Sequence, residues 1–289
     1  MKIVQLEYFC AVSRYHSIAQ ASQQLFVTPP AISNAIKELE KEFSVSLFTR
    51  SKNHMTLTKE GEQFYRKASE LLEAVNQTAC EFADIGKQII PIRIGIPPLL
   101  STIFFPEMLM EFQRQYPDTP VELYEYGSIR AARMVQNDSL DLALVNMNFY
   151  EIDKLNSFQI ISDQIVFCVS PDHHYANEKS ITIEMLKDEP VLMYNTDSVQ
   201  NSTLQTHFSN AGIKPTVIMH ASQFYTIRNF IKQNLGGACL YSSLLHNMPG
   251  LIGIPFSPNI EQAIGIVWQK GRYVNSQVEK FIAFTKEYF

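Results

Sequence analysis

Three amphipathic patterns follow one another within the first 43 residues of the chain. Apolar side chains recur every three or four positions in each, which predicts three short helices. The three stripes are Ile3, Leu6, Phe9 and Cys10, then Ile18, Ala19, Ala21 and Leu25, then Ile32, Ile36, Leu39 and Phe43. Ser17 and Thr28 stand at N-cap positions, and Pro29 or Pro30 fits a first helical turn that needs no backbone N–H. The tight connection before the third helix is typical of a helix-turn-helix, whose partner is duplex DNA.

The outward face of the third predicted helix is polar. It carries Pro29, Pro30, Ser33, Asn34 and Lys37. Ser33 and Asn34 can hydrogen-bond base edges or phosphates, and Lys37 can neutralise a phosphate or reach a guanine. With Ser17 and Thr28, these residues are the predicted DNA contacts of this segment. The alternative is a solvated face on an ordinary three-helix domain.

A short hairpin is predicted directly after these helices. Val45, Leu47 and Phe48 are apolar, residues 49–54 form a polar turn, and residues 55–58 read as a second strand. Arg50 and Lys52 are expected at the tip of this wing, where they would contact the DNA backbone or minor groove. Residues 1–58 are therefore predicted to be a winged helix-turn-helix domain.

A long apolar stripe then predicts a linker helix over residues 59–87. Thr58 can cap it, and Glu60 and Glu62 lie in its first turn, where acidic side chains favour the helix dipole. The stripe is close to a heptad repeat and comprises Phe64, Ala68, Leu71, Val75, Ala79 and Phe82. Such a seam packs either on the body of its own chain or on a second copy.

Residues 91–289 alternate between strand and helix patterns, which predicts an α/β domain with a mostly parallel sheet. Strands are expected at 92–96, 121–126, 140–145, 165–169, 191–194, 216–219, 238–240 and 263–268. We expect two lobes, lobe I at about 91–161 and 266–289 and lobe II at about 162–265, with a cleft between them.

Ligands in such sheets bind beyond the carboxyl ends of the strands. This rule selects a set of candidate residues for binding a small-molecule effector: Pro98, Leu99, Leu100, Ser101, Thr102, Ser128, Asn146, Met147, Tyr194, Thr196 and Phe224. Several lie at helix N-termini, which favour anions, so a small carboxylate is the expected class. Because Pro97 to Leu100 are apolar, we expect the ligand to be partly apolar. The alternative is that these residues merely terminate strands.

Composition narrows the class of protein. The chain has 289 residues, 46% hydrophobic and 18% charged, with a net charge of −5. Residues 1–58 carry six Lys or Arg and four Glu, a net +2, which leaves −7 for the remainder. The net charge alone therefore does not indicate a DNA-binding protein. The N-terminus has no signal-peptide pattern and no window reaches the length of a membrane span, so we expect a cytoplasmic protein without a membrane partner.

Residues that could carry other chemistry are sparse. Cys10, Cys80, Cys168 and Cys239 are widely spaced, which argues against disulfides and zinc, although a redox-sensing pair is an alternative. His173-His174 has no further ligands at metal-binding spacing, and it is expected in an exposed turn. Glu38, Glu40 and Glu42 read as a solvated face. No phosphate-binding loop, dinucleotide motif or nucleophile elbow is present, so neither a cofactor nor an enzymatic activity is expected.

The first sixty residues resemble the head of the LysR-type transcriptional regulators. The resemblance rests on L-x-V-T-x-P-A-I-S from Leu25, S-L-F-T-R from Ser46 and L-T-K-E-G from Leu57, where x marks a position that is not part of the match. Pro29 stands where this family usually has Gln, and Asn34 where it often has Arg, so base readout is expected to shift to Ser33, Lys37 and DNA shape. Segments such as I-R-I-G-I-P-P and L-D-L-A-L-V are similar to the family's effector domain, which has the periplasmic-binding-protein fold.

The resemblance implies a regulator that binds promoter DNA as a homodimer, assembled further into a homotetramer, and responds to a small molecule. It favours a dimer seam through Phe64, Ala68, Leu71, Val75 and Phe82. RNA polymerase is a further expected partner. The competing classes are a DNA-binding repressor or architectural protein without a ligand, and an enzyme that uses the two-lobed cleft. The enzyme class does not explain why a winged helix and a long seam precede the two-lobed domain. For a DNA-binding protein without a ligand, a full two-lobed cleft would be superfluous.

Overall fold

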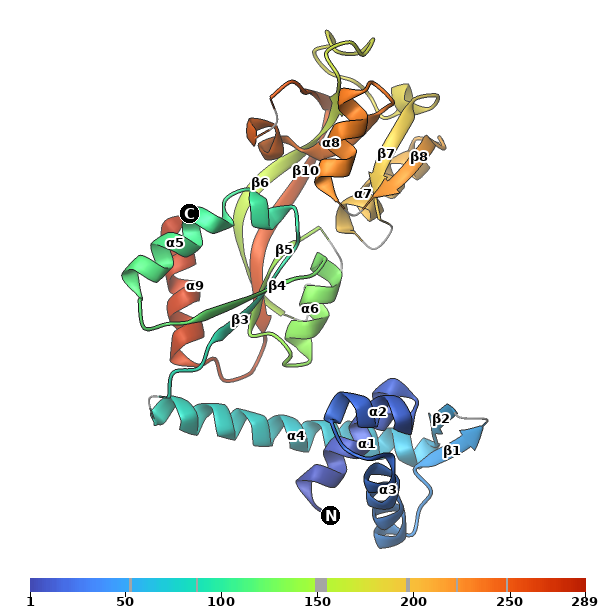
Figure 1. Cartoon of the computed structure of the whole chain (residues 1–289), viewed down its shortest axis with the longest axis vertical. Helices are drawn as coiled ribbons and strands as arrows, with labels where there is room; N and C mark the ends of the chain where they lie inside the picture. Colours follow the sequence, from blue (N-terminus) through green and yellow to red (C-terminus); the bar gives the residue numbers. More distant parts are fainter. Residues whose placement is uncertain (52–53, 87, 149–154, 196–197, 222, 248) are drawn as a thin grey trace. The chain divides into compact units, whose positions relative to one another are not determined.

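The computed structural model describes residues 1–51, 54–86, 88–148, 155–195, 198–221, 223–247 and 249–289. The chain divides into two compact units, Met1–Gln88 and Ile89–Phe289. Figure 1 shows helices, a small hairpin and one long helix in the first unit, and a sheet covered by helices in the second. No helix in the described parts of the chain is both long enough and apolar enough to cross a membrane.

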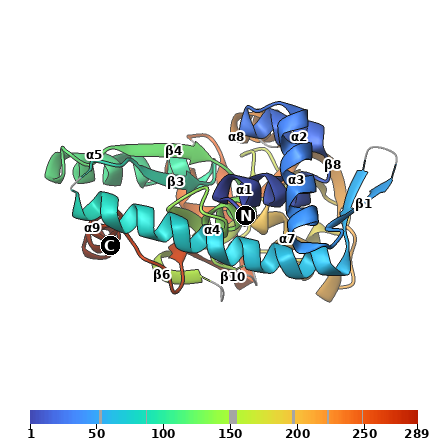
Figure 2. The same ribbon diagram turned by 90° about the horizontal axis from the view of Figure 1, so that it is seen from below.

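The first unit contains the three predicted short helices and the predicted long one. Its elements are α1 (Ile3–Tyr15), α2 (Ile18–Leu25), α3 (Pro29–Phe43), β1 (Phe48–Ser51), β2 (His54–Leu57) and α4 (Lys59–Ile85). The predicted apolar stripes meet in one core, in which Phe9, Ile32 and Leu39 are fully buried. Figure 2 shows α1 to α3 grouped at the N-terminal end of the α4 rod.

The helix starts follow the predicted capping residues, with one difference. The Ser17 hydroxyl accepts a hydrogen bond from the Gln20 N–H, and the Thr58 hydroxyl accepts one from the Gly61 N–H at 2.9 Å. Thr28 occupies the N-cap of α3 but makes no side-chain capping bond. Its hydroxyl therefore lies at the start of α3 without a role in holding the helix.

The wing is tighter than predicted. Thr49 to Ser51 belong to β1 and His54 to β2, so most of the expected polar turn over 49–54 is strand. Arg50 pairs with Met55 in the antiparallel register, which places its backbone in the strand and not at the tip. The prediction missed this because polar residues on a two-stranded, solvent-exposed hairpin alternate too little to reveal the strand.

Two residues of the first unit fasten the wing. A Glu40 carboxylate oxygen accepts hydrogen bonds from the N–H groups of Leu47, at 2.8 Å, and Phe48, at 3.3 Å. A Cβ on Gly61 would lie 2.1 Å from the Leu47 carbonyl oxygen, so only glycine lets α4 start so close to the wing. The solvated face expected for Glu38, Glu40 and Glu42 is therefore wrong for Glu40.

The second unit is built on one eight-stranded sheet with the order β4-β3-β5-β10-β6-β9-β7-β8. The strands are β3 (Ile92–Ile96), β4 (Val121–Glu125), β5 (Leu142–Asn146), β6 (Leu155–Val169), β7 (Pro190–Tyr194), β8 (Thr216–Ala221), β9 (Gly237–Tyr241) and β10 (Ile252–Gln269). The helices are α5 (Phe105–Gln115), α6 (Ser128–Gln136), α7 (Val199–Asn210), α8 (Phe224–Lys232) and α9 (Ser276–Tyr288), with short 3₁₀ segments that include η1 (Leu100–Thr102).

The expected mostly parallel sheet is mixed. β3 pairs in parallel with β4 and β5, and β7 pairs in parallel with β8 and β9, so each end of the sheet is a parallel lobe. The middle is an antiparallel pair, β6 and β10, far longer than the predicted strands at 165–169 and 263–268. Both strands run from one lobe into the other, and the expected lobe borders at 161/162 and 265/266 fall inside them.

Helices cover both faces of this sheet. α5, α8 and α9 pack on one face, where Phe112 of α5 meets Phe281 of α9 with ring centroids 4.9 Å apart. α6 and α7 pack on the other face through Ala131, Val135 and Leu204. The carboxyl ends of β3, β5, β7 and β9 point toward the junction between the lobes, which is where the predicted ligand site should form.

Candidate DNA-binding face and ligand pocket

The predicted DNA contacts gather on the exposed side of α3. Ile32, Ile36 and Leu39 are buried on one side of this helix. Pro29, Pro30, Asn34 and Lys37 are exposed on the other, with Ser33 half-buried beside them and Thr28 exposed at the N-cap. The face therefore combines hydroxyl, amide and ammonium groups, the donor set that reads phosphates and base edges.

Three further predicted contacts lie away from α3. Ser17 is the N-cap of α2, and its hydroxyl accepts the Gln20 N–H at 3.3 Å while keeping its own proton. Lys52 falls outside the described residues, as does the side chain of Arg50.

The predicted seam on α4 divides into two halves. The Phe64 ring lies 5.0 Å from the Phe9 ring and 5.5 Å from the Phe43 ring, and Ala68 is only 1% exposed. Ala68 is buried within its own unit, so its expected place in a dimer seam is wrong, and half-buried Phe64 is partly covered by its own unit. Leu71, Val75 and Phe82 are exposed, at 49%, 39% and 66%. They are joined by exposed Ile85.

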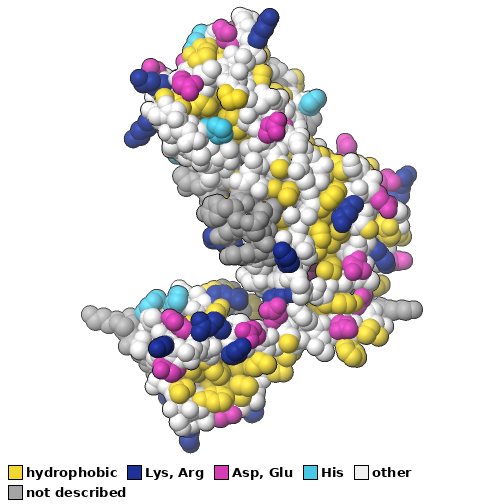
Figure 3. Space-filling model, turned by 180° about the vertical axis from the view of Figure 1, so that it is seen from behind, with side chains coloured by type: hydrophobic (Ala, Val, Ile, Leu, Met, Phe, Trp, Pro, Cys, Tyr) yellow, Lys and Arg dark blue, Asp and Glu magenta, His cyan; other side chains and the backbone are white. Residues whose placement is uncertain are grey.

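An apolar groove lies beside the exposed half of the seam. Its walls are Met1, Ile3 and Leu6 from the start of the chain and Leu71, Leu72 and Val75 from α4. Hydrophobic side chains are visible on the surface of this unit in Figure 3. The exposed seam and the groove form one continuous apolar strip, because they share Leu71 and Val75.

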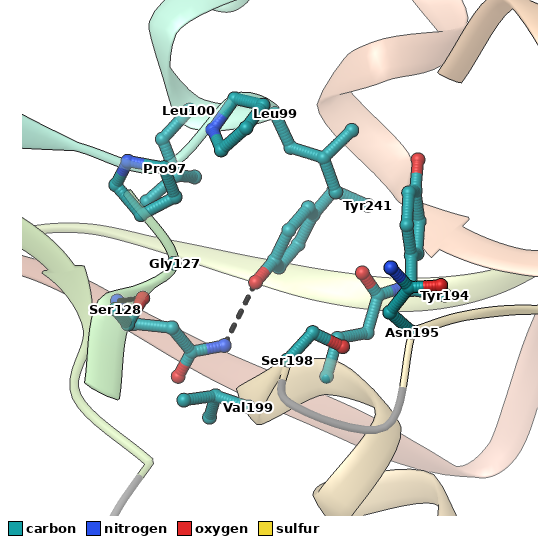
Figure 4. Close-up of a pocket in the computed structure, with 13 residues that line it drawn as sticks. Pro97, Leu99, Leu100, Gly127, Ser128, Tyr194, Asn195, Ser198, Val199 and Tyr241 are labelled. Carbon is teal, nitrogen blue, oxygen red and sulfur yellow. Dashed lines mark hydrogen bonds between the residues drawn. The ribbon is translucent and has the colours of Figure 1, made fainter. Parts of the chain in front are cut away.

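A pocket opens at the junction of the two lobes in the second unit. It encloses about 740 Å³ of space, part of it open to solvent. Lobe I contributes Pro97, Pro98, Leu99, Leu100, Gly127, Ser128 and Asn146, and lobe II contributes Tyr194, Asn195, Ser198, Val199, Gln200 and Tyr241. In Figure 4 the Tyr241 ring crosses the pocket toward Ser128, with Leu99 above it and Val199 below.

Six of the predicted ligand-binding residues line this pocket, and four do not. Pro98, Leu99, Leu100, Ser128, Asn146 and Tyr194 are in the wall. Ser101 and Thr102 are outside it, and their hydroxyls donate to the carbonyls of Pro98 and Leu99, the two residues before η1. Thr196 lies outside the described residues.

Met147 and Phe224 are also absent from the wall. The Met147 sulfur lies over Gly265, where a Cβ would be only 2.3 Å from it. Phe224 begins α8 and packs against the hydrophobic core cluster that includes Ile227 and Ile231 of the same helix. Both residues follow strands, as predicted, but their side chains turn to the sheet and not to the pocket.

Seven wall residues are absent from the predicted set. Pro97, Gly127 and Asn195 are sequence neighbours of predicted residues, whereas four were missed outright: Ser198, Val199, Gln200 and Tyr241. Tyr241 ends β9 and the other three open α7, so the same strand-end rule would have found them. The predicted strand at 238–240 stopped one residue short of Tyr241. The loop after Tyr194 was considered only as far as Thr196, and Ser198, the N-cap of α7, lies two residues beyond it.

Asn146 is the centre of a buried hydrogen-bond network. It is 1% exposed, and its Nδ2 donates to the Tyr241 hydroxyl at 2.8 Å and to Gln262 Oε1 at 2.6 Å. Its backbone N–H donates to the Ser128 hydroxyl at 3.0 Å, and its Oδ1 accepts the Asn148 N–H at 2.9 Å. The bond to Tyr241 is the dashed line in Figure 4. Asn146 thus joins lobe I to lobe II and has little capacity left for a ligand.

The pocket is uncharged but electrostatically polar. None of its described wall residues carries a charged side chain. The N-termini of α6, at Ser128, and α7, at Val199, both reach the wall, and each brings the N–H groups of a first helical turn and the positive end of a helix dipole. Burial raises the pKa of Tyr241 to about 12 and also raises the pKa of Tyr194, so both phenols stay protonated at neutral pH.

One cluster of metal-ligand types lies elsewhere in lobe II. His173, His174 and Glu189 come together, with His174 Nε2 2.9 Å and His173 Nε2 3.4 Å from the Glu189 carboxylate. His173 is buried, so the expected exposed turn is wrong for this residue. Its Nδ1 accepts the Tyr175 N–H at 3.2 Å, and this leaves the ring proton on Nε2, the atom that faces Glu189. An Nε2 that keeps its proton cannot bind a metal, so this geometry suits a hydrogen-bonded cluster.

The two central cysteines are arranged so that they cannot meet. Cys168 of β6 pairs with Ala238, and Phe167 pairs with Cys239 of β9. Because side chains alternate along strands, Cys168 and Cys239 point to opposite faces of the sheet and belong to different core clusters. Burial raises the pKa of both thiols, that of Cys239 to about 12.

Comparison with known proteins covers almost the whole chain. Residues 3–62 match the family model of bacterial regulatory helix-turn-helix proteins of the lysR family, and residues 91–289 match the LysR substrate binding domain. The HTH-type transcriptional regulator YwbI of Bacillus subtilis is 34% identical, and the match covers 100% of this chain and 97% of YwbI.

Two solved structures have the same fold. A full-length variant of OxyR from Pseudomonas aeruginosa aligns with a TM-score of 0.69 at 22% identity, covering 99% of this chain and 95% of OxyR. Full-length CbnR in complex with its target DNA aligns with a TM-score of 0.61 at 16% identity, covering 99% of each chain.

Proposed function

Because the chain belongs to the LysR family of bacterial transcriptional regulators, we propose that its α3 face contacts promoter DNA and that the pocket at the lobe junction binds its effector. The protein is a DNA-binding regulator that responds to a small molecule. What is proposed is which residues do this and how. The observation that carries the proposal is the pairing of an exposed polar α3 face with a formed, uncharged pocket built from both lobes.

The DNA contacts proposed are Ser17, Thr28, Ser33, Asn34 and Lys37, with Arg50 and Lys52 of the wing. The hydroxyls of Ser17 and Thr28 lie at helix N-termini, where they and the backbone N–H groups suit phosphates. Asn34 and Lys37 suit base edges. Pro29 and Pro30 cannot donate, so they contribute apolar contact and a rigid helix start.

A single copy of the first unit would hold DNA weakly, because residues 1–58 carry a net charge of only +2. We therefore infer that dimerisation is part of DNA binding. The exposed half of the seam, with Leu71, Val75 and Phe82, is the proposed contact, and burying it removes an apolar strip from water. A dimer would present two α3 helices to two half-sites.

A tetramer, built as a dimer of dimers, is the proposed complete assembly. The second unit exposes large apolar side chains of its own, among them Met110 of α5 and Tyr225 of α8. These offer a second, independent contact between copies. The proposed place of action is the cytoplasm, with RNA polymerase as a further partner at the promoter and without enzymatic activity.

The proposed effector is a small, partly apolar carboxylate. Two helix N-termini and two phenols surround the pocket, while Pro97, Leu99 and Val199 form an apolar wall. Regulation then follows from linkage. An effector that binds one arrangement of the lobes better shifts the oligomer toward it, and this changes how the two α3 helices are presented to DNA.

The DNA-binding half of the proposal is tested on a duplex that the wild-type protein enriches from a random pool. Replacing Ser33 and Lys37 together by Ala should weaken binding at least about tenfold, because a base or phosphate contact is lost at each position. Replacing Lys37 alone by Ala should also make the DNA-binding constant less dependent on salt concentration, because about one counterion fewer is released on binding. Lys41→Ala, on the same helix near its C-terminus, is the control. Binding unchanged in the double variant would reject α3 as the recognition helix.

A further inference from the structure

We propose that the pocket takes an effector that carries a neutral hydrogen-bond donor, a hydroxyl or N–H group, and that Gln200 selects this donor. The inference rests on the proposed function of this pocket as the effector site. It concerns one side chain in the first turn of α7, on the lobe II side of the wall.

Backbone groups determine which way round the Gln200 amide lies. Gln200 Nε2 donates to the Cys239 carbonyl oxygen at 2.6 Å. A carbonyl can only accept, so the atom at this distance must be the nitrogen, and a flipped amide would place two acceptors against each other. The neighbouring Asn201 Nδ2 donates to the Tyr194 carbonyl at 2.7 Å. These two amides fasten the first turn of α7 to β9 and β7, and they hold Gln200 Oε1 in one orientation.

Gln200 Oε1 is a buried acceptor that has no hydrogen-bond partner among the described residues. The residue is only 3% exposed, so bulk water does not replace the missing partner. Buried polar atoms are nearly always hydrogen-bonded in native proteins, and an acceptor left without a donor costs stability. Because Gln200 lines the pocket, a ligand bound there can supply the donor.

The hydroxyl groups of the wall do not impose the same choice on a ligand. The hydroxyls of Ser128, Ser198 and Tyr241 each accept a hydrogen bond from the protein already. A hydroxyl also has both a proton and lone pairs to offer, so it suits donors and acceptors alike. The Tyr194 hydroxyl, which is buried without a partner in the described part of the chain, has the same dual character. An amide oxygen can only accept.

The two other amides of the wall are not equivalent to Gln200. Asn146 Oδ1 already accepts the Asn148 N–H at 2.9 Å. Asn195 is exposed, so water can solvate its amide. Gln200 is therefore the wall residue at which a donor on the ligand gains most.

The donor on the ligand should be neutral. The N-termini of α6 and α7 reach the wall, and each places the positive end of a helix dipole beside the pocket. No described wall residue carries a negative side chain that would offset this potential. An ammonium group would therefore bind poorly, whereas a hydroxyl or an amide N–H donates without carrying a charge. Together with the proposed carboxylate, this predicts a hydroxylated carboxylate as the effector.

The first test compares pairs of ligands that differ by one donor. The probes are 3-hydroxybenzoate and 4-hydroxybenzoate, each set against the corresponding fluorobenzoate, in calorimetric titrations of the full-length protein. Hydroxyl and fluorine are similar in size, but only the hydroxyl donates. At least one hydroxybenzoate should bind the wild type about 5-fold to 10-fold more tightly than its fluorobenzoate, the gain expected for one hydrogen bond. Because both members of a pair are carboxylates, the ratio of their affinities does not depend on how the carboxylate is bound.

The second test removes the acceptor. Gln200→Met keeps a side chain of similar length without an amide oxygen, so the fluorobenzoate should bind this variant at least as tightly as the hydroxybenzoate. Gln200→Glu restores an oxygen acceptor and should restore the preference for the hydroxyl. Gln205→Met is the matched control, because Gln205 is an exposed residue of the same helix outside the pocket wall, and it should keep the wild-type ratio.

A merely structural role of Gln200 gives a different result. The Cys239 carbonyl also loses a donor in Gln200→Met, and thermal denaturation measures the stability lost in this way. The ratio of two affinities for the same folded variant cancels that loss. A structural role would weaken both members of a pair equally and leave their ratio unchanged.

Equal affinities of the hydroxybenzoates and the fluorobenzoates for the wild type would overturn the inference, as would a hydroxyl preference that survives in Gln200→Met. The same conclusion follows if no hydroxybenzoate binds at about 10 mM. Failure of the proposed pocket itself is distinguishable through Leu99→Trp, which fills the cavity. Probes that bind this variant as well as the wild type occupy some other site, so the pocket assignment fails and not only the role of Gln200.

Discussion

At the scale of single residues, several positions that resemble a DNA-binding signature serve the fold. Glu40 and Gly61 belong to the family-like head, yet Glu40 accepts two wing N–H groups and Gly61 lies against the Leu47 carbonyl. A one-dimensional pattern places Glu40 on a polar helix face but does not reveal its partners seven and eight residues away. Asn146 is the same case in the pocket. Its position after a strand was predictable, but its network of four partners was not.

Glu40→Ala should lower the free energy of unfolding by about 2 kcal/mol, because two backbone donors lose a charged acceptor. Glu40→Gln keeps an oxygen acceptor and should lower the free energy of unfolding by less. Glu42→Ala, which removes only a surface ion pair with the N-terminal amine, should change stability least. Urea denaturation of the three variants measures the order of their stabilities. Equal stability of Glu40→Ala and Glu42→Ala would show that the wing does not depend on Glu40.

Cys168 and Cys239 should not act as a peroxide-sensing pair. Their side chains face opposite sides of the sheet, and burial raises the pKa of both thiols, so the reactive thiolate is scarce at neutral pH. Treatment of the native protein with hydrogen peroxide, followed by mass spectrometry, should show no disulfide between them. An intramolecular Cys168–Cys239 disulfide formed without unfolding would refute this arrangement.

At the scale of elements, helices with strong apolar periodicity were predictable and long crossing strands were not. The α1, α2, α3 and α4 stripes gave bounds within a few residues, because one face of each helix is buried. β6 and β10 were predicted only over their most apolar segments. Those segments are almost continuously buried, whereas many of the remaining residues of both strands are partly or fully exposed and do not form a continuous apolar run. The division of the α4 seam into a packed half and an exposed half could not be predicted either. Apolar periodicity shows that a stripe is covered, but not whether its own chain or a second copy covers it.

The two halves of the seam predict opposite behaviour. Leu71→Glu combined with Phe82→Glu should dissociate the dimer while leaving the fold intact, because both side chains are exposed within one copy. Phe64→Ala should instead destabilise the first unit by about 3 kcal/mol or more, because it opens a cavity beside Phe9. Analytical ultracentrifugation and thermal denaturation separate the two effects. A Leu71→Glu, Phe82→Glu variant that sediments as the wild type would exclude this strip as the dimer contact.

At the scale of the whole molecule, the proposed function joins two roles in one oligomer. In that proposal a second copy compensates for the weak charge of the DNA-binding unit, and a ligand that bridges the two lobes favours one arrangement of them. The fold class followed from the order of patterns along the chain, and the family followed from the motifs in the first sixty residues. A small carboxylate was expected from helix N-termini beyond the strand ends, and it stays a proposal. The structure adds that the N-termini of α6 and α7 reach one pocket wall, in which no described residue has a charged side chain.

Occupancy of the pocket should change how the protein holds DNA, and this coupling is the central claim. The direct measurement is a titration of the enriched duplex, labelled at both ends, with the full-length protein in the presence and absence of a carboxylate that binds the pocket. The ligand should shift the dissociation constant about 5-fold to 150-fold or alter the end-to-end distance of the bound duplex, and Leu99→Trp should abolish the response. A ligand that occupies the pocket at saturation but changes neither quantity would contradict the account.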